Sequence, residues 1–202
     1  MAIGAKIALF DLDNTLVDYT GGLVESLNRI RSEGEPPITR DNCYDPPAAG
    51  WKRERMRLIR LVPGWWRELP VNPLGIRLFE IAREIGFEMH ILTRGPVSNP
   101  NAWKEKVEWC QDRLAGDYKI TITEDKSTVY GRVLVDDYPP YMTAWLEHRA
   151  RGIGIMPKNA YNASFAHERV LLCDESNVDE ARRRMIRSFA RLAGAMEFDA
   201  QD

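Results

Sequence analysis

Cysteine is scarce in this chain, and long apolar runs and an excess of one charge are missing. Cys43, Cys110 and Cys173 are far apart and form no CxxC pair, so we expect no disulfide framework and a reducing, cytoplasmic location. No run approaches the ~18 apolar residues of a membrane span, and the N-terminus does not resemble a signal peptide. A net charge of −2 gives no general electrostatic reason to expect a membrane or a stable nucleic-acid partner.

The chain has the composition of an ordinary globular protein. Its 202 residues, of which 44% are hydrophobic and 29% are charged, suffice for one core domain with a small insertion. Short apolar runs of strand character lie at 6–10, 87–92, 132–137 and 152–156, with a weaker one at 169–173. Helical patterns separate them, at 72–86, 99–116, 139–152 and 177–194. This alternation predicts an α/β fold, a Rossmann-like parallel sheet with helices on both faces.

One region interrupts the alternation. Residues 18–71 contain no clear strand, but two helix-like segments separated by a Pro-rich loop. We therefore expect a core domain formed by residues 1–17 and 72–202, and a small helical cap formed by residues 18–71. The insertion follows the first strand directly, so it is expected to cover the strand ends.

Polar residues follow the predicted strands at the points where the strands end. The segment "KIALFDLDNTLVD" places Asp11 and Asp13 after the first strand, "ILTRGP" places Thr93 after the second, and "VLVDD" ends in Asp136 and Asp137. Lys126 lies shortly before that last strand. Because ligands bind at the carboxyl ends of parallel strands, we expect these side chains to converge.

Such a set of side chains has a definite chemistry. Close carboxylates repel one another, and oxygen ligands suit Mg²⁺. A cation, a lysine and a threonine would bind a dianionic phosphate. One carboxylate can then attack phosphorus to give an aspartyl-phosphate, while another two residues on protonates the leaving alkoxide. The sequence thus predicts a Mg²⁺-dependent phosphoryl-transfer enzyme.

These motifs, in this order and at these strand ends, resemble the four motifs of the haloacid-dehalogenase-like (HAD) hydrolase superfamily. The resemblance implies that Asp11 is the nucleophile and Asp13 the general acid/base. It implies that Thr93 and Lys126 hold the phosphate, and that Asp11, the Asp13 carbonyl and Asp136 hold Mg²⁺. Asp137 would be either a second metal ligand or an outer-shell acid. An acid at position 13 resembles the phosphatase and phosphomutase branches.

A closer resemblance is to the 5'(3')-deoxyribonucleotidase family. The segments that carry it are "PGWWRELPVNPLGIRLFEIAREIG", "ILTRGP", "KEKVEWCQDRL" and "ITEDKSTVYGRVLVDD", and it extends to part of "GIGIMPKNAYN" (152–162). The resemblance implies hydrolysis of nucleoside monophosphates, with Trp65 and Trp66 as base contacts, although aromatic residues there could equally serve packing. Arg94 departs from the family pattern and would contact phosphate or face solvent. Residues 163–202 carry no motif of the family.

The sequence leaves alternatives open. The same chemistry could serve a sugar phosphate, another small metabolite or a nucleic-acid end, although the last would favour a basic groove. A phosphoacceptor signalling module also gathers acids, a hydroxyl and a lysine at strand ends, but has no place for an insertion of this size. The oligomeric state, monomer or homodimer, is not specified by the sequence.

Overall fold

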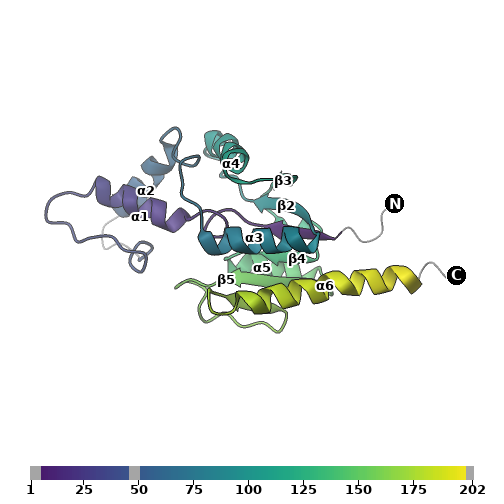
Figure 1. The fold of residues 1–202 in the computed structure, drawn as a ribbon. Coiled ribbons are helices and arrows are strands. Elements are labelled where there is room, and N and C mark those ends of the chain that lie inside the picture. Colours follow the sequence, from purple (N-terminus) through teal and green to yellow (C-terminus); the bar gives the residue numbers. More distant parts are fainter. Residues whose placement is uncertain (1–5, 46–50, 199–202) are drawn as a thin grey trace. The chain divides into compact units, whose positions relative to one another are not determined.

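The computed structural model describes residues 6–45 and 51–198, with side chains described as far as residue 190. It divides into two compact units (Figure 1). Residues 1–16, 72–94 and 117–202 form the first unit, and residues 17–71 and 95–116 form the second. Residues 95–116, which we expected in the core domain, therefore group with the insertion. Residues 46–50, the end of the expected Pro-rich loop, and the two chain ends lie outside the described residues.

The first unit is built on a six-stranded parallel sheet, which confirms the predicted fold class. Its strand order is β3-β2-β1-β4-β5-β6, with every neighbouring pair parallel. The strands are β1 (Ile7–Phe10), β2 (Glu88–Thr93), β3 (Lys119–Ile122), β4 (Val133–Val135), β5 (Ile153–Pro157) and β6 (Val170–Cys173). The order reverses between β1 and β4, so the carboxyl ends of these two strands border the crevice where ligands bind in open α/β sheets.

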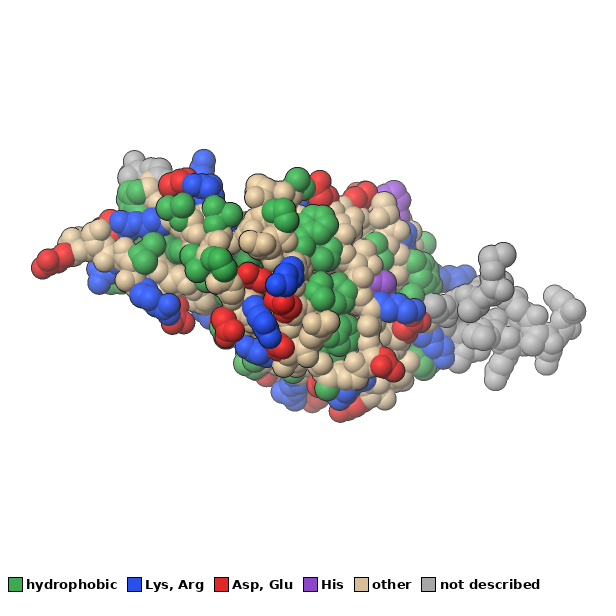
Figure 2. All heavy atoms as spheres, turned by 90° about the horizontal axis from the view of Figure 1, so that it is seen from above, with side chains coloured by type: hydrophobic (Ala, Val, Ile, Leu, Met, Phe, Trp, Pro, Cys, Tyr) green, Lys and Arg blue, Asp and Glu red, His purple; other side chains and the backbone are tan. Residues whose placement is uncertain are grey.

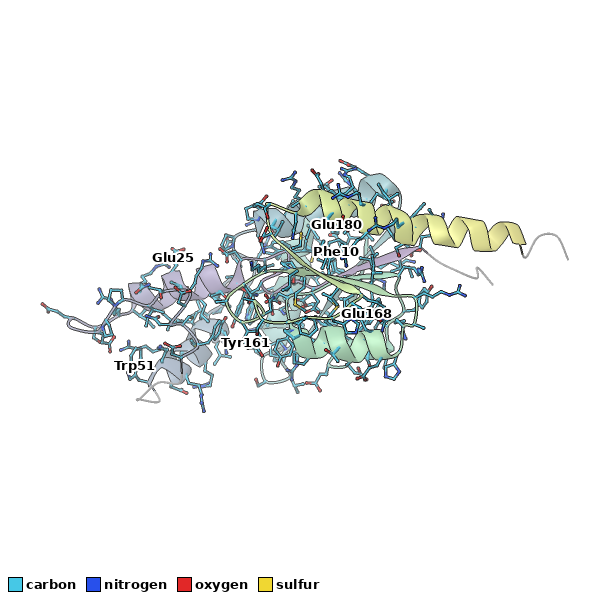
Figure 3. All side chains as sticks on the ribbon, turned by 90° about the horizontal axis from the view of Figure 1, so that it is seen from below. Phe10, Glu25, Trp51, Tyr161, Glu168 and Glu180 are labelled. Atoms are coloured by element: carbon cyan, nitrogen blue, oxygen red, sulfur yellow. The ribbon has the colours of Figure 1, made fainter. Side chains whose placement is uncertain are left out.

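Helices of the first unit cover both faces of this sheet. They are α3 (Pro73–Ile85), α5 (Pro139–Glu147) and α6 (Val178–Phe198). In Figure 3 the sheet lies between α6, drawn in yellow, and α5, drawn in green. Successive residues of β1 serve the two faces, as the strand period of two requires. Leu9 packs in a cluster with Trp145 of α5, whereas Phe10 meets Phe79 of α3 edge-to-face with ring centroids 5.2 Å apart.

The edge strand β3 is absent from the sequence prediction. Its four residues, "KITI", alternate polar and apolar side chains, and none of them is fully buried. The apolar runs that revealed the inner strands reflect burial on both faces of the sheet. Of the two edge strands, β6 keeps the apolar run "VLLC" and is predicted, as the weakest of the five, whereas β3 has no such run and gives a weaker signal.

The second unit consists of α1 (Tyr19–Arg29), α2 (Trp51–Leu61), α4 (Pro100–Arg113) and their connections. Buried side chains of α4 hold the segment that follows α2. The Glu105 carboxylate accepts hydrogen bonds from the N–H groups of Gly64 and Trp66, at 2.8 and 3.1 Å. Trp109 Nε1 donates to the Leu69 carbonyl at 2.8 Å. These bonds explain why α4 groups with the insertion rather than with the sheet.

Two surface properties bear on the partners that the sequence predicted. Among the residues that the structure describes, no helix has the length and apolar character needed to cross a membrane. On the face drawn in Figure 2, acidic and basic side chains are interspersed. Such a mixed surface does not favour a polyanionic partner on that face.

Candidate active site

A tight turn follows β1 and carries the Asp-x-Asp motif. The N–H of Asp11 still donates to the Val135 carbonyl of β4 at 2.9 Å, so Asp11 continues the strand. The N–H of Thr15 then donates back to the Leu12 carbonyl at 3.1 Å, which closes the turn. Asn14 adopts a φ of 59°, a left-handed conformation that asparagine tolerates better than most residues. The sequence thereby brings its two acids to the carboxyl end of the sheet.

Residues at the beginning of α3 pack against this turn and hydrogen-bond to it. Asn72 Nδ2 donates to the Asn14 carbonyl at 3.1 Å, and the Asn72 N–H donates to the Leu16 carbonyl at 2.8 Å. Gly75 packs so closely that a Cβ at this position would lie 1.7 Å from the Thr15 carbonyl oxygen. Any other residue at 75 would displace the turn. Neither Asn72 nor Gly75 was among the predicted site residues.

A buried lysine joins the first acid to the acids that follow β4. Lys126 begins the short 3₁₀ helix η1 (Lys126–Thr128), and its side chain points into the core of the site with only 2% of the residue exposed. Its Nζ donates to Asp11 Oδ1 at 2.5 Å and to Asp136 Oδ2 at 2.7 Å. Asp11 and Asp136 are 6% and 0% exposed. Sequence positions 11, 126 and 136 therefore meet as predicted.

The two neighbouring acids, Asp136 and Asp137, have different surroundings. Both carboxylate oxygens of Asp136 already accept hydrogen bonds, one from Lys126 and the other from the Tyr138 N–H at 2.9 Å. Asp137 accepts one hydrogen bond at its Oδ2, from Asn159 Nδ2 at 3.0 Å. Its main chain is held by Thr15 Oγ1, which accepts from the Asp137 N–H at 3.2 Å. The Asp137 carboxylate therefore keeps more capacity to bind a further ligand.

The cluster carries more negative charge than its single lysine compensates. Burial, together with Asp136 and Asp13, raises the pKa of Asp11 to about 7, although Lys126 opposes the shift. Burial, Asp136 and Asp11 likewise raise the pKa of Asp137 well above its ordinary value. Burial opposes the charge of Lys126, but Asp11 and Asp136 outweigh this effect and raise the lysine pKa.

These properties fit a bound cation. Carboxylate oxygens of Asp11, Asp136 and Asp137 lie within 4.8 Å of one another, and all three residues are buried. An all-oxygen donor set of this kind suits a hard divalent cation. The raised pKa values of Asp11 and Asp137 show that the site lacks positive charge. A bound cation would supply this charge.

The remaining predicted residues of the first unit lie at the end of β2 and just beyond it. Thr93 is the last residue of β2 and is fully buried. Arg94 is exposed and forms an ion pair with Glu124, with 3.4 Å between nitrogen and oxygen. Tyr141 of α5 hydrogen-bonds Arg94 and also covers Lys126, whose Nζ lies 4.7 Å from the ring centroid. Arg94 is thus linked to the lysine through one aromatic ring.

Trp65 and Trp66 belong to the second unit, and both have packing partners there. Trp66 is 6% exposed and stacks on Tyr19 with ring centroids 5.5 Å apart. Trp65 is half-buried, and its Nε1 donates to Ser26 Oγ at 3.0 Å. The packing interpretation therefore suits Trp66, while Trp65 retains an exposed part.

Several residues of the site were not among the site residues predicted from the sequence. Asn162 Nδ2 donates to the carbonyls of Asp137 and Pro157, at 2.8 and 2.9 Å, which fixes the loop after β5. Tyr138 and Tyr161 stack with ring centroids 5.8 Å apart and an interplanar angle of 9°. Figure 3 labels Tyr161 on the loop after β5. The sequence cues are that Tyr138 directly follows the acidic pair and that Tyr161 and Asn162 end the segment 152–162, part of which carries the family resemblance.

Comparison with known protein families shows which family the chain belongs to. Residues 5–180 match the family described as "5' nucleotidase, deoxy (Pyrimidine), cytosolic type C protein". The chain belongs to this family. It is accordingly a hydrolase of the phosphatase class, and the predicted resemblance to nucleotidases is confirmed.

Curated relatives agree with this nucleotidase family. A predicted 5'(3')-deoxyribonucleotidase of Bordetella bronchiseptica is 25% identical over 142 residues, which cover 66% of this chain and 74% of the relative. A second predicted 5'(3')-deoxyribonucleotidase, from Vibrio phage KVP40, is 27% identical over 133 residues, which cover 65% of each chain.

Solved structures confirm the HAD-like fold. A predicted haloacid dehalogenase-like hydrolase of Burkholderia xenovorans has a TM-score of 0.52 at 16% identity, covering 89% of this chain and 97% of that one. A HAD family hydrolase of Deinococcus radiodurans, solved with bound phosphate and sodium, has a TM-score of 0.51 at 15% identity, covering 87% of this chain and 96% of that one.

Proposed function

We propose that this chain is a cytoplasmic, Mg²⁺-dependent phosphomonoesterase that acts as a 5'(3')-deoxyribonucleotidase, hydrolysing nucleoside monophosphates through an aspartyl-phosphate on Asp11. The observation that carries the proposal is the buried contact of Lys126 with Asp11 and Asp136 at the carboxyl edge of the sheet. It holds a nucleophilic carboxylate beside a fixed positive charge. The name of the family and of the curated relatives supports the choice of a nucleotide substrate.

In the first step the Asp11 carboxylate attacks phosphorus and the bond to the leaving oxygen breaks. Asp13, two residues further along the turn and half-buried, gives its proton to the leaving alkoxide. Lys126 stabilises the negative charge on the phosphoryl oxygens, and the Thr93 hydroxyl at the end of β2 adds a hydrogen-bond donor. The result is a free nucleoside and an acyl phosphate on Asp11.

In the second step Asp13, now deprotonated, takes a proton from a water molecule that attacks phosphorus. The acyl-phosphate bond breaks, so inorganic phosphate leaves and the Asp11 carboxylate is restored. The hydrogen bond from Lys126 holds Asp11 in one orientation through both steps. The Asn72 and Gly75 contacts keep the turn in place, so that Asp11 and Asp13 stay on the same side of the sheet.

We propose Asp11 and Asp137 as side-chain ligands of Mg²⁺ and the Asp13 carbonyl as a main-chain ligand. The resemblance gave Asp136 as a metal ligand and left Asp137 as either a second ligand or an outer-shell acid, so this proposal keeps Asp137 as a ligand and gives Asp136 a different role. Both oxygens of Asp136 are engaged by Lys126 and the Tyr138 N–H, so its role is to fix the lysine. A cation held by these residues would neutralise the carboxylates and polarise a phosphoryl oxygen.

The substrate is tested by phosphate release from a panel of 5'- and 3'-nucleoside monophosphates, ribo and deoxy, together with sugar phosphates. We expect Mg²⁺-dependent activity with a preference for nucleotides that disappears in Asp11→Asn. Activity on sugar phosphates alone would keep the chemistry and reject the nucleotide. Stable phosphorylation without turnover would instead favour a phosphoacceptor module.

A further inference from the structure

Several arginines line a depression at the amino ends of the strands, opposite the candidate active site at their carboxyl ends. This depression, here called the arginine pocket, has a volume of about 190 Å³ in the first unit. Its arginines come from the starts of three strands and from one helix, and are Arg132, Arg151, Arg169, Arg184 and Arg187. Arg132 directly precedes β4 and Arg169 directly precedes β6. Because the strands are parallel, the arginine pocket lies at their amino ends, away from Asp11 and Asp136.

The charge of the arginine pocket is strongly one-sided. Five arginines line it together with a single acid, Glu168, although the whole chain has a net charge of −2. Figure 3 labels Glu168 on the part of the chain that leads into β6. Like charges held in a concave surface repel one another more strongly than on an open one. An anion is therefore the ligand that this lining favours.

Two contacts fix positive charge in the pocket without neutralising it. Arg169 donates from its two terminal nitrogens to the carbonyls of Arg149 and Leu146, at 2.5 and 3.0 Å. Carbonyl oxygens are uncharged, so the guanidinium keeps its full charge while its position is set. These hydrogen bonds therefore orient Arg169 for binding an anion and do not neutralise its charge.

The helix α6 contributes two further arginines and a hydroxyl. Arg184 and Arg187 share one oxygen of Glu180, each through a single nitrogen, at 3.2 and 3.1 Å. One carboxylate oxygen therefore serves two guanidinium groups. Ser188 lines the same pocket, is 4% exposed, and its Oγ has no hydrogen-bond partner among the described residues. A buried hydroxyl without a partner is costly, and an anion oxygen would satisfy it.

We propose that the arginine pocket is a second, Mg²⁺-independent binding site for a small molecule that carries a phosphate group. Guanidinium groups match phosphate oxygens in geometry and charge. The volume corresponds to about six water molecules, enough for a phosphate with a small substituent. The site is separate from the catalytic residues, so the proposal does not depend on the reaction assigned to Asp11.

The experiment measures binding of inorganic phosphate to the full chain in EDTA by isothermal titration calorimetry. Without Mg²⁺ the buried acids of the catalytic site repel phosphate, so binding reports on the arginine pocket. The test variant is Arg184→Gln with Arg187→Gln. The matched control is Arg183→Gln, because Arg183 lies on the same helix and pairs with the same Glu180 but does not line the pocket.

We expect one phosphate per chain for the wild type, with binding at least about tenfold weaker in the double variant and nearly unchanged in the control. Ser188→Ala should weaken binding by a smaller factor, and a nucleoside 5'-monophosphate in place of phosphate shows whether the site also accepts a substituent. Absence of binding in EDTA would overturn the proposal. So would an equal loss in the control, or binding that survives the double variant and disappears in Lys126→Met.

Discussion

Both units bury charged side chains, but they satisfy these charges in different ways. In the second unit the Glu105 carboxylate accepts from two main-chain N–H groups, and Lys52 Nζ donates to the Asn42 carbonyl at 2.8 Å. In the first unit buried charges face one another, since Lys126 lies between Asp11 and Asp136. A buried charge that is hydrogen-bonded to neutral main-chain groups, as for Glu105 and Lys52, holds a loop in place. Where buried charges face one another and acids are in excess, a deficit of positive charge remains that a bound cation would compensate.

The largest effect is expected from removing Asp11, the proposed nucleophile. Asp11→Asn keeps the shape of the side chain but cannot form the acyl phosphate, so kcat should fall by at least about a thousandfold. Phosphate release at saturating substrate and Mg²⁺ measures this. Glu108→Gln, at a half-buried acid of α4 that pairs with the exposed Lys104, serves as a control that should retain activity. Turnover by the Asp11 variant at a comparable rate would remove nucleophilic catalysis.

Asp11→Asn should also change how the stability of the folded protein depends on pH, because the pKa of Asp11 is raised. The pKa of Asp11 is raised from 3.8 to about 7, so the folded state without metal holds this proton more tightly than the unfolded chain. The stability that the Asp11 proton contributes to the wild type is therefore lost as pH rises between about 4 and 7. In EDTA, Asp11→Asn should be more stable relative to the wild type at pH 8 than at pH 5, as measured by urea unfolding. A constant difference would argue against the raised pKa.

Mg²⁺ should stabilise the first unit through the same acids. At a concentration 100 times the dissociation constant, a ligand that binds only the folded state stabilises it by about 2.7 kcal/mol. Asp137→Asn should abolish most of this gain, because Asp137 is the acid with spare capacity. Thermal unfolding with and without Mg²⁺ measures the difference. If Asp136→Asn removed the gain and Asp137→Asn did not, the two acids would have to exchange roles.

In the second unit, loss of a buried charge should affect stability rather than chemistry. Glu105→Ala leaves the Gly64 and Trp66 N–H groups without their acceptor and should cost about 2 kcal/mol of unfolding free energy. Denaturant unfolding measures this loss, and kcat on a small ester such as p-nitrophenyl phosphate should change little. A large loss of kcat with unchanged stability would mean that this charge also has a chemical role.

The smallest effect is expected at Trp65. If its exposed part stacks on a base, Trp65→Ala should raise KM for a nucleotide by roughly tenfold, because such stacking is worth about 1–3 kcal/mol. The KM for p-nitrophenyl phosphate should stay nearly constant. Trp66→Ala is the comparison, since its buried ring should affect stability more than KM. Equal changes of KM for both substrates would remove the stacking hypothesis.

The sequence predicts the sheet and the acids well, because both depend on local pattern. Asp11 and Asp136 each follow a run of buried apolar residues, and the topology then brings them together. The pattern cannot separate Asp136 from Asp137, since the difference lies in partners such as Asn159, which is distant in the chain. It also misses β3, whose four residues alternate polar and apolar side chains and form no continuous apolar run.

The arginine pocket could not be predicted for a related reason. Its arginines are spread from position 132 to position 187 and form no motif. Only the parallel arrangement of β4, β5 and β6 places their starting residues beside α6. The grouping of α4 with the insertion could not be predicted either. It depends on the contacts of Glu105 and Trp109, which the helical pattern of the sequence does not reveal.

The measurement that most directly tests the central claim is the capture of the phosphorylated residue. The Asp13→Asn variant is mixed with p-nitrophenyl phosphate and Mg²⁺, quenched in acid and reduced with borohydride, which converts an aspartyl-phosphate to homoserine. The good leaving group needs no general acid, whereas hydrolysis of the intermediate needs Asp13, so the intermediate should accumulate. Peptide mass spectrometry should then find homoserine at position 11. Release of nitrophenol without homoserine at that position would contradict nucleophilic attack by Asp11.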